Sequence, residues 1–170
     1  PIYSATGFLK SQWRSDGYPD LTLPFSDSYI NSRSSTRSCE NAWSVGDTDD
    51  VTTAGGSIAA TVQKVSSNSA IFVEDGQVIP STTLNDIAST WESTIFPTVT
   101  SYFGSAPDVD NTCQIEIVIF SIDGGGGIGG YFVPGLSSSK ESIFMDIDDL
   151  SWRNTICLLY TSPSPRDQRG

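Results

Sequence analysis

The sequence of 170 residues predicts an α+β or α/β fold, in which a mixed sheet is layered with one main amphipathic helix. Three observations support this prediction. Apolar residues alternate over residues 57–65, they recur at three- and four-residue steps over residues 84–103, and they are nearly continuous over residues 114–122. These patterns are typical of a half-exposed strand, an amphipathic helix and a central strand covered on both faces.

A β-hairpin is expected first. Ile58, Ala60 and Val62 share one face of the alternating stretch, and a run of Ser and Asn at residues 66–69 follows. The short apolar run at residues 70–73 then forms the second strand.

The helix is expected over residues 83–103. Ser81, Thr82 and Thr83 offer hydroxyl groups for its N-cap, and Gly104 is a natural end. Pro97 has no backbone N–H to donate, so we expect the helix to kink or divide near residues 92–93.

Two later strands are expected to be buried on both faces, at residues 114–122 and 142–147. One helix covers only one face of a sheet. We therefore expect a large exposed apolar patch on the other face, and a chain that aggregates or stays partly molten when expressed alone.

Composition excludes several function classes. Nine Lys and Arg face 20 Asp and Glu, which gives a net charge of -11, so binding to nucleic acid or to an anionic membrane is not expected. The sequence contains no His, which excludes a Ser-His-Asp triad, a Cys-His pair and an imidazole zinc ligand. No apolar run approaches the roughly 18 residues of a membrane helix.

The chain divides into three parts. Residues 1–42 are polar and are interpreted as a leader or the end of a preceding module, and residues 43–150 carry the α/β pattern. Residues 151–170 are interpreted as a non-native tail, in which residues 157–170 resemble translated sequencing adapter, with a genuine disordered tail as the alternative. Since residue 1 is Pro, the true start is expected upstream.

Acidic residues supply one candidate site. Asp146, Asp148 and Asp149 lie at a strand end, and Asp108, Asp110 and Asn111 share a loop, so each group offers oxygen ligands that suit Ca²⁺. Acidic loops that only solubilise the chain are the alternative. The isolated acids, among them Glu74, Glu92, Glu116 and Glu141, are interpreted as a solvated acidic surface. The glycine run at residues 124–127 is interpreted as a surface loop rather than a phosphate site.

Three stretches together resemble one protein family. They are residues 69–78, which include FVEDG, residues 83–88, and residues 95–105, which include PTVTSYFGS. The resemblance is to the region before the catalytic helix in bacterial secreted zinc metallopeptidases of the hyicolysin type. It continues through residues 115–120, 130–132 and 141–146, and so covers roughly residues 43–149.

The resemblance implies an incomplete zincin-like N-terminal subdomain of a secreted endopeptidase that acts on polypeptides. In that family a helix with His-Glu-x-x-His follows, whose imidazoles hold zinc and whose Glu activates water. We expect this motif shortly after Asp149 in the complete gene. Because this sequence has no His, no catalytic or zinc-binding residue is carried over, and the chain itself is expected to be inactive.

By the same resemblance, the penultimate strand is a sheet edge that pairs with extended substrate. Its residues here are Gly130, Tyr131, Phe132 and Val133. A buried strand without substrate contact is the alternative. Export would allow Cys39 and Cys113 to form a disulfide, and the sequence leaves that pairing open.

The rival class is a non-enzymatic secreted binding or adhesion module, stabilised by calcium. Its candidate carbohydrate platform is the set of tryptophans Trp13, Trp43, Trp91 and Trp152. The oligomeric state is not indicated by the sequence.

Overall fold

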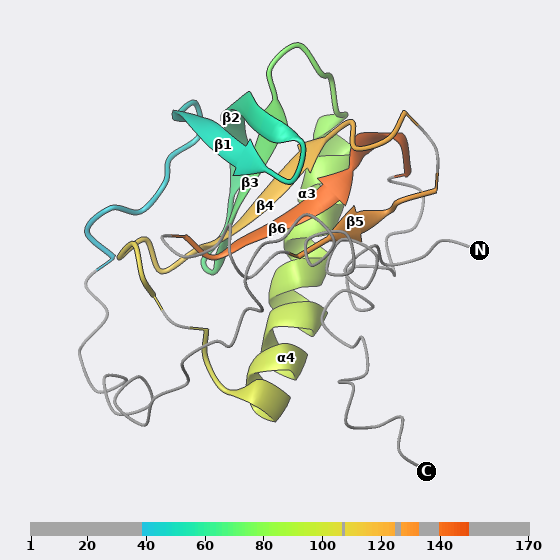
Figure 1. Cartoon of the computed structure of the whole chain (residues 1–170). Coiled ribbons are helices and arrows are strands. Elements are labelled where there is room, and N and C mark those ends of the chain that lie inside the picture. The colour runs from blue at the N-terminus through green and yellow to red at the C-terminus, as the bar shows by residue number, and fades with distance from the viewer. Residues whose placement is uncertain (1–38, 107, 125–126, 133–139, 150–170) are drawn as a thin grey trace, which may run out of the picture.

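The computed structural model describes residues 39–106, 108–124, 127–132 and 140–149, which form a mixed sheet with one long helical segment on one face (Figure 1). The predicted α+β class is confirmed. The six strands lie in the order β1-β2-β3-β4-β6-β5. Their bounds are Thr48–Thr53 for β1, Gly56–Val65 for β2, Ser69–Glu74 for β3, Ile115–Phe120 for β4, Gly130–Tyr131 for β5 and Ser142–Asp146 for β6.

The predicted hairpin is formed by β2 and β3, which pair antiparallel with a bulge between Val62 and Lys64. Strand β1 pairs antiparallel with β2 and was not predicted. Its sequence, TDDVTT, contains a single apolar residue, Val51, so its pattern carries no strand signal. The bulge bends β2, the long strand that pairs with β1.

The centre of the sheet is parallel. Strand β4 pairs with β3 on one side and with β6 on the other, and all six of its residues are buried. The helical segment connects β3 to β4, as a crossover between parallel strands requires. Strand β5 pairs antiparallel with β6 and ends the sheet.

The helical segment consists of α3 (Ser81–Thr90), the π-helical turn η2 (Trp91–Ile95) and α4 (Phe96–Phe103). The π-helical turn includes residues 92–93, where a disturbance was predicted, because Pro97 offers no N–H to the carbonyl of Ser93. The predicted hydroxyl caps are wrong. The N-cap is Pro80, with no side-chain hydrogen bond, and Ser81, Thr82 and Thr83 lie inside the first turns. The helix ends at Gly104, whose φ of 80° suits glycine.

The face toward the helix is filled by one apolar cluster. Trp91 and Ile95, each 1% exposed, pack there against Ile71, Ile117 and Ile143 of the central strands. The tryptophan is oriented by its Nε1, which donates to the carbonyl of Asn68 (3.3 Å). The remaining buried members are Val73, Ile79, Leu84, Ile87, Ala88, Ile115, Ile119 and Met145.

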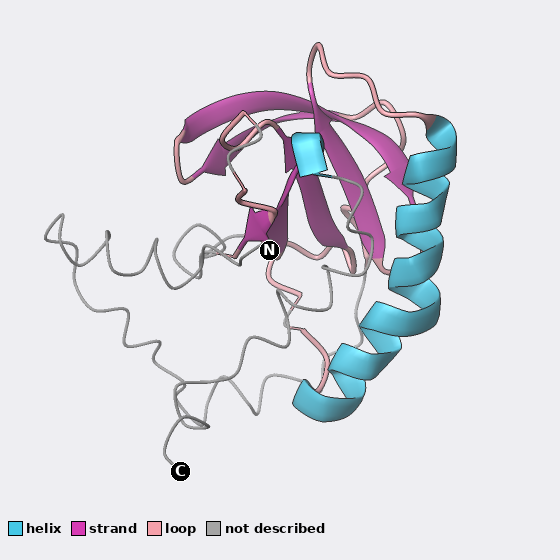
Figure 2. Cartoon of the chain, turned by 90° about the vertical axis from the view of Figure 1, so that its right-hand side faces the viewer, coloured by secondary structure: helices cyan, strands magenta, loops and turns pink. Residues whose placement is uncertain are grey.

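The opposite face is also buried, so the predicted apolar patch is wrong for the described residues. Phe72, Val118 and Phe144 are at most 1% exposed, and the exposed large apolar side chains in the described ranges are scattered at Val45, Val78, Val109 and Phe132. The sheet curves over this face (Figure 2). Ala54 N, in the β1–β2 turn, donates to Tyr131 Oη of β5 (3.1 Å), which links the two outermost strands.

Trp43 supplies further cover for this face. Its ring meets Phe72 edge-on with the centroids 5.0 Å apart. Phe120, Tyr131 and Phe144 form an aromatic group beside it, in which Tyr131 stacks on Phe144 at 4.8 Å. Within the described residues, no helix is both long enough and apolar enough to span a bilayer.

Phe144 and Phe132 form a matched pair for testing this closed face. Phe144 is 1% exposed and Phe132 is 36% exposed. We expect Phe144→Ala to lower the free energy of unfolding by about 3–5 kcal/mol, because it leaves a cavity under Tyr131. Phe132→Ala should change it by less than about 1 kcal/mol. Urea unfolding of both variants checks this, and equal losses would contradict a buried second face.

Candidate functional site

The predicted substrate edge lies at the end of the sheet. Strand β5 is the outermost strand, and Asp146 N donates to the carbonyl of Gly129 (3.1 Å) just before it. Since backbone groups alternate in direction along a strand, the N–H groups of Gly130 and Phe132 point away from β6, while that of Tyr131 points toward it. Val133 lies outside the described residues. Of these two residues only Phe132 is exposed, because Gly130 is buried.

Tyr131 faces inward, away from any ligand at this edge. Its side chain is 2% exposed and stacks on Phe144. Burial raises the pKa of its phenol, although the hydrogen bond from Ala54 N opposes the shift. Among the described residues predicted at this edge, Phe132 has the only exposed side chain.

Asp146 is the last residue of β6 and Asp148 follows it, which is the strand end predicted for them, and both bind the loop after β4. Asp146 Oδ1 accepts a hydrogen bond from Ile122 N (3.0 Å), and Asp148 Oδ2 accepts one from Ser121 Oγ (3.0 Å). Burial raises the pKa of Asp146, and the nearby carboxylates of Asp148 and Asp123 raise it further. The side chain of Asp149 lies outside the described part of the chain.

The second acidic group also binds its own loop. Asp108 Oδ1 accepts from Cys113 N (2.9 Å), and Asp110 Oδ1 accepts from the N–H and hydroxyl of Thr112. In the described part of the chain, no three side chains of His, Cys, Asp or Glu converge as a metal site would require. Nor do these residues fit zinc, since the sequence has no His. The contacts of these acidic side chains are those of groups that hold their own loops in place.

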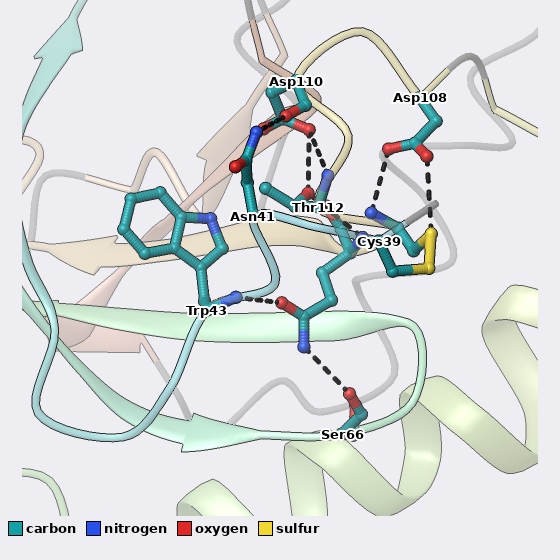
Figure 3. Close-up of a disulfide and its surroundings, with 9 residues drawn as sticks. Cys39, Asn41, Trp43, Ser66, Asp108, Asp110 and Thr112 are labelled. Carbon is teal, nitrogen blue, oxygen red and sulfur yellow. Dashed lines mark hydrogen bonds between the residues drawn. A yellow bond between two sulfur atoms is a disulfide. The ribbon is translucent and has the colours of Figure 1, made fainter. Parts of the chain in front are cut away.

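Cys39 and Cys113 form a disulfide, which answers the pairing question left open by the sequence (Figure 3). Both residues have positive φ, 47° and 61°. Asn41 Nδ2 donates to the carbonyl of Asp110 (2.9 Å), and Trp43 N donates to Gln114 Oε1 (2.8 Å). The bridge and these bonds fasten residues 39–43 to the loop before β4 and place Trp43 over Phe72.

Glu116 is the main departure from the sequence interpretation. It was assigned to a solvated acidic surface, but its exposed fraction is 0%. Its Oε2 accepts from Ser142 Oγ (2.8 Å), and its Oε1 lies 3.5 Å from Lys140 Nζ. Burial raises the pKa of Glu116, and the positive charge of Lys140 opposes this.

Lys140 joins this buried acid to a second carboxylate. Its Nζ forms an ion pair with Asp49 Oδ2 of β1 and lies 5.1 Å from the centre of the Trp43 ring. Sequence reasoning missed this group, because Asp49 and Lys140 are 91 residues apart. The available signal was a single Glu inside the apolar run IEIVIF. A charge in a central strand needs a buried partner.

Glu92 also departs from a solvated surface. Its carboxylate accepts from Ser66 Oγ and from the N–H and Nδ2 of Asn68 at 2.6–2.7 Å, which joins the β2–β3 turn to the helix. Burial favours a higher pKa for Glu92, but these donors outweigh it and lower the pKa.

The described tryptophans form no carbohydrate platform. Trp91 is buried under the helix, and Trp43 packs edge-on against Phe72 on the opposite face of the sheet. Trp13 and Trp152 lie outside the described residues. The feature expected of the rival binding module is therefore absent from the part of the chain that the structure describes.

Comparison with models of known protein families finds no match for this chain, and comparison with curated proteins finds no relative of significant similarity.

The disulfide is expected to contribute strongly to stability. It joins residues 74 positions apart, and a loop of this length gives roughly 4 kcal/mol in the chain-entropy treatment. We expect the double variant Cys39→Ser, Cys113→Ser to lose about that much unfolding free energy in urea. Cys157→Ser is the control that leaves the bridge in place. A double variant as stable as the control would contradict this role.

Glu141 is expected to make stability depend on pH. Its Oε1 accepts from Val109 N (2.9 Å), and burial raises its pKa from 4.5 to about 7. The folded state keeps the Glu141 proton at a higher pH than the unfolded chain does. The free energy of unfolding therefore falls as the pH rises from 4.5 to about 7.

Glu141→Gln should therefore gain unfolding free energy relative to the unmodified chain as pH rises, by on the order of 1 kcal/mol after allowance for solvent screening. Denaturant unfolding below and above the interval measures the difference between the two proteins. A difference that does not change with pH would refute the assignment to Glu141.

Proposed function

We propose that this chain is the pre-catalytic part of a secreted zinc-dependent endopeptidase of the hyicolysin type, and that β5 is its substrate-binding edge. The proposal rests on the sequence resemblance. The observation that supports it best is the place of β5 as the outermost strand, antiparallel to β6. The resemblance assigns the substrate edge to this same penultimate strand.

An open strand can bind an extended peptide through its backbone groups. Phe132 turns its N–H group away from β6, and it adds an exposed ring that an apolar substrate side chain can contact. Tyr131 supports the edge from below through its stack on Phe144. In this proposal, the described residues bind and orient the peptide.

Peptide hydrolysis itself belongs to the zinc-binding helix that the family carries after this region, where the metal activates a water molecule. The described residues offer no ligand set for that metal. Export of the protein is supported by the Cys39–Cys113 bridge, because disulfides persist in oxidising compartments. The acidic composition agrees with a soluble exported domain.

A proline at the open edge tests the binding role in the complete protein. Phe132→Pro removes one outward N–H, whereas Phe132→Ala keeps it and removes only the ring. We expect Phe132→Pro to raise KM for an extended peptide about 3- to 10-fold beyond the alanine variant, as the loss of one hydrogen bond predicts. Tyr131→Pro is unsuitable, because Tyr131 is 2% exposed and pairs with β6.

Two results would overturn the proposal. A complete gene that continues past residue 149 without His-Glu-x-x-His removes the peptidase assignment. Peptidase activity with equal KM values for the proline and alanine variants removes the edge-binding role and leaves the enzyme class in place.

A further inference from the structure

The cluster around Glu116 has the parts of a covalent cross-link. We propose that Lys140 and Asp49 join spontaneously in an isopeptide bond, with Glu116 as the acid that carries the proton. The product is an amide between Lys140 Nζ and Asp49 Cγ. It would tie β1 to the residues just before β6.

The reacting groups are already together. Lys140 Nζ is in direct contact with Asp49 Oδ2 and lies 3.5 Å from Glu116 Oε1. Glu116 is held in place by Ser142 Oγ, which donates to Oε2 (2.8 Å), while its Oε1 has no hydrogen-bond partner. An amine and a carboxyl group that are held in contact react at a high effective concentration.

The surroundings shield the reacting groups from water and favour the acid form of Glu116. Trp43 covers Lys140 at 5.1 Å from its ring centre, and the side chains of Lys140 and Asp49 are only 30% and 27% exposed. Burial raises the pKa of Glu116, so its acid form is favoured over that of a Glu in water. Burial alone would lower the pKa of Lys140, but pairing with Asp49 and Glu116 outweighs it and raises the pKa.

In the proposed reaction, the proton on Lys140 passes to its ion-pair partner Asp49, with which it is in direct contact. Its transfer to Asp49 gives an amine and a carboxylic acid, and the nitrogen lone pair then attacks Asp49 Cγ. Glu116 gives its proton to the departing hydroxyl oxygen of Asp49 and takes one from the attacking nitrogen. The Nζ–Cγ bond forms, one Cγ–O bond breaks, and one water leaves without any oxidant or cofactor.

The bond would also explain why a buried acid is kept in the central strand. Asp49 and Lys140 are 91 residues apart, and their link would fix β1 over the face that holds Val118 and Phe144. An ion pair that is about one-third exposed would stabilise this closure only weakly.

The intact mass of the oxidised chain tests the proposal. We expect a mass below that of the sequence by the two hydrogens of the disulfide and by one water, about 18 Da. After reduction and trypsin digestion, residues 38–64 and 65–153 should appear as one branched peptide that is uncut at Lys140. A folded, disulfide-bonded chain at full mass apart from the disulfide hydrogens overturns the proposal.

Three variants test the roles. Lys140→Arg keeps the charge but has no primary amine, so it should keep its water. Asp49→Asn should lose ammonia, about 17 Da, in place of water. Glu116→Gln keeps the shape of the side chain and should slow the mass change at least tenfold. Full condensation in Glu116→Gln overturns the role of Glu116, and loss of a water from Lys140→Arg overturns the assignment to Lys140.

Discussion

The sheet bears apolar side chains on both faces, but in the described part of the chain one helical segment covers only one of them. The residues of the second face are buried as well, and the sheet curves over them. A bulge in β2 bends the strand that carries β1, and the β1–β2 turn meets Tyr131 on the far edge of the sheet. Trp43, fastened through the Cys39–Cys113 bridge, fills the space over Phe72. The arrangement of the remaining polar groups follows from this closure.

Curvature brings together residues that the strand order alone would separate. Strands β1 and β6 are not neighbours in the sheet, yet Asp49 and Lys140 form an ion pair across the closed face. Glu116 is buried beside this ion pair. Its Oε1 pairs with Lys140, and its Oε2 accepts a hydrogen bond from Ser142. The polar cluster and the aromatic cluster are thus two parts of one interior, since each needs the sheet to bend.

Sequence patterns predicted the regular elements well. The hairpin, the helix with its disturbance before Pro97, and the central strand at residues 115–120 were all predictable, because each has a local apolar period or a local breaker. Strand β1 and the burial of the second face were not. Both depend on contacts between residues far apart in the sequence, such as Ala54 with Tyr131, and a local apolar pattern does not indicate such contacts.

The candidate site was predictable only in outline. The position of β5 as an edge followed from the resemblance, whereas the inward side chain of Tyr131 did not. The acidic residues were recognised as groups, but the hydrogen bonds that Asp108 and Asp146 accept from nearby backbone were not predictable. The one Glu whose position mattered most was interpreted as part of the surface, because a single sequence does not show which charge has a buried partner.

The covalent link and the buried polar contacts of the described residues are concentrated at one end of the sheet. The disulfide at Cys113 and the pair of Glu116 and Ser142 lie where β4 and β6 begin. Where these strands finish, hydrogen bonds of Ser121 with Glu74 and Asp148, and of Ile122 with Asp146, hold the chain. Because the described residues have no covalent link at this end, we expect local opening to begin there, and the backbone amides there to exchange with solvent before those near Cys113. Strand β5 pairs with Phe144 and Met145 near this end, so the candidate substrate edge lies in the part of the sheet that we expect to open first.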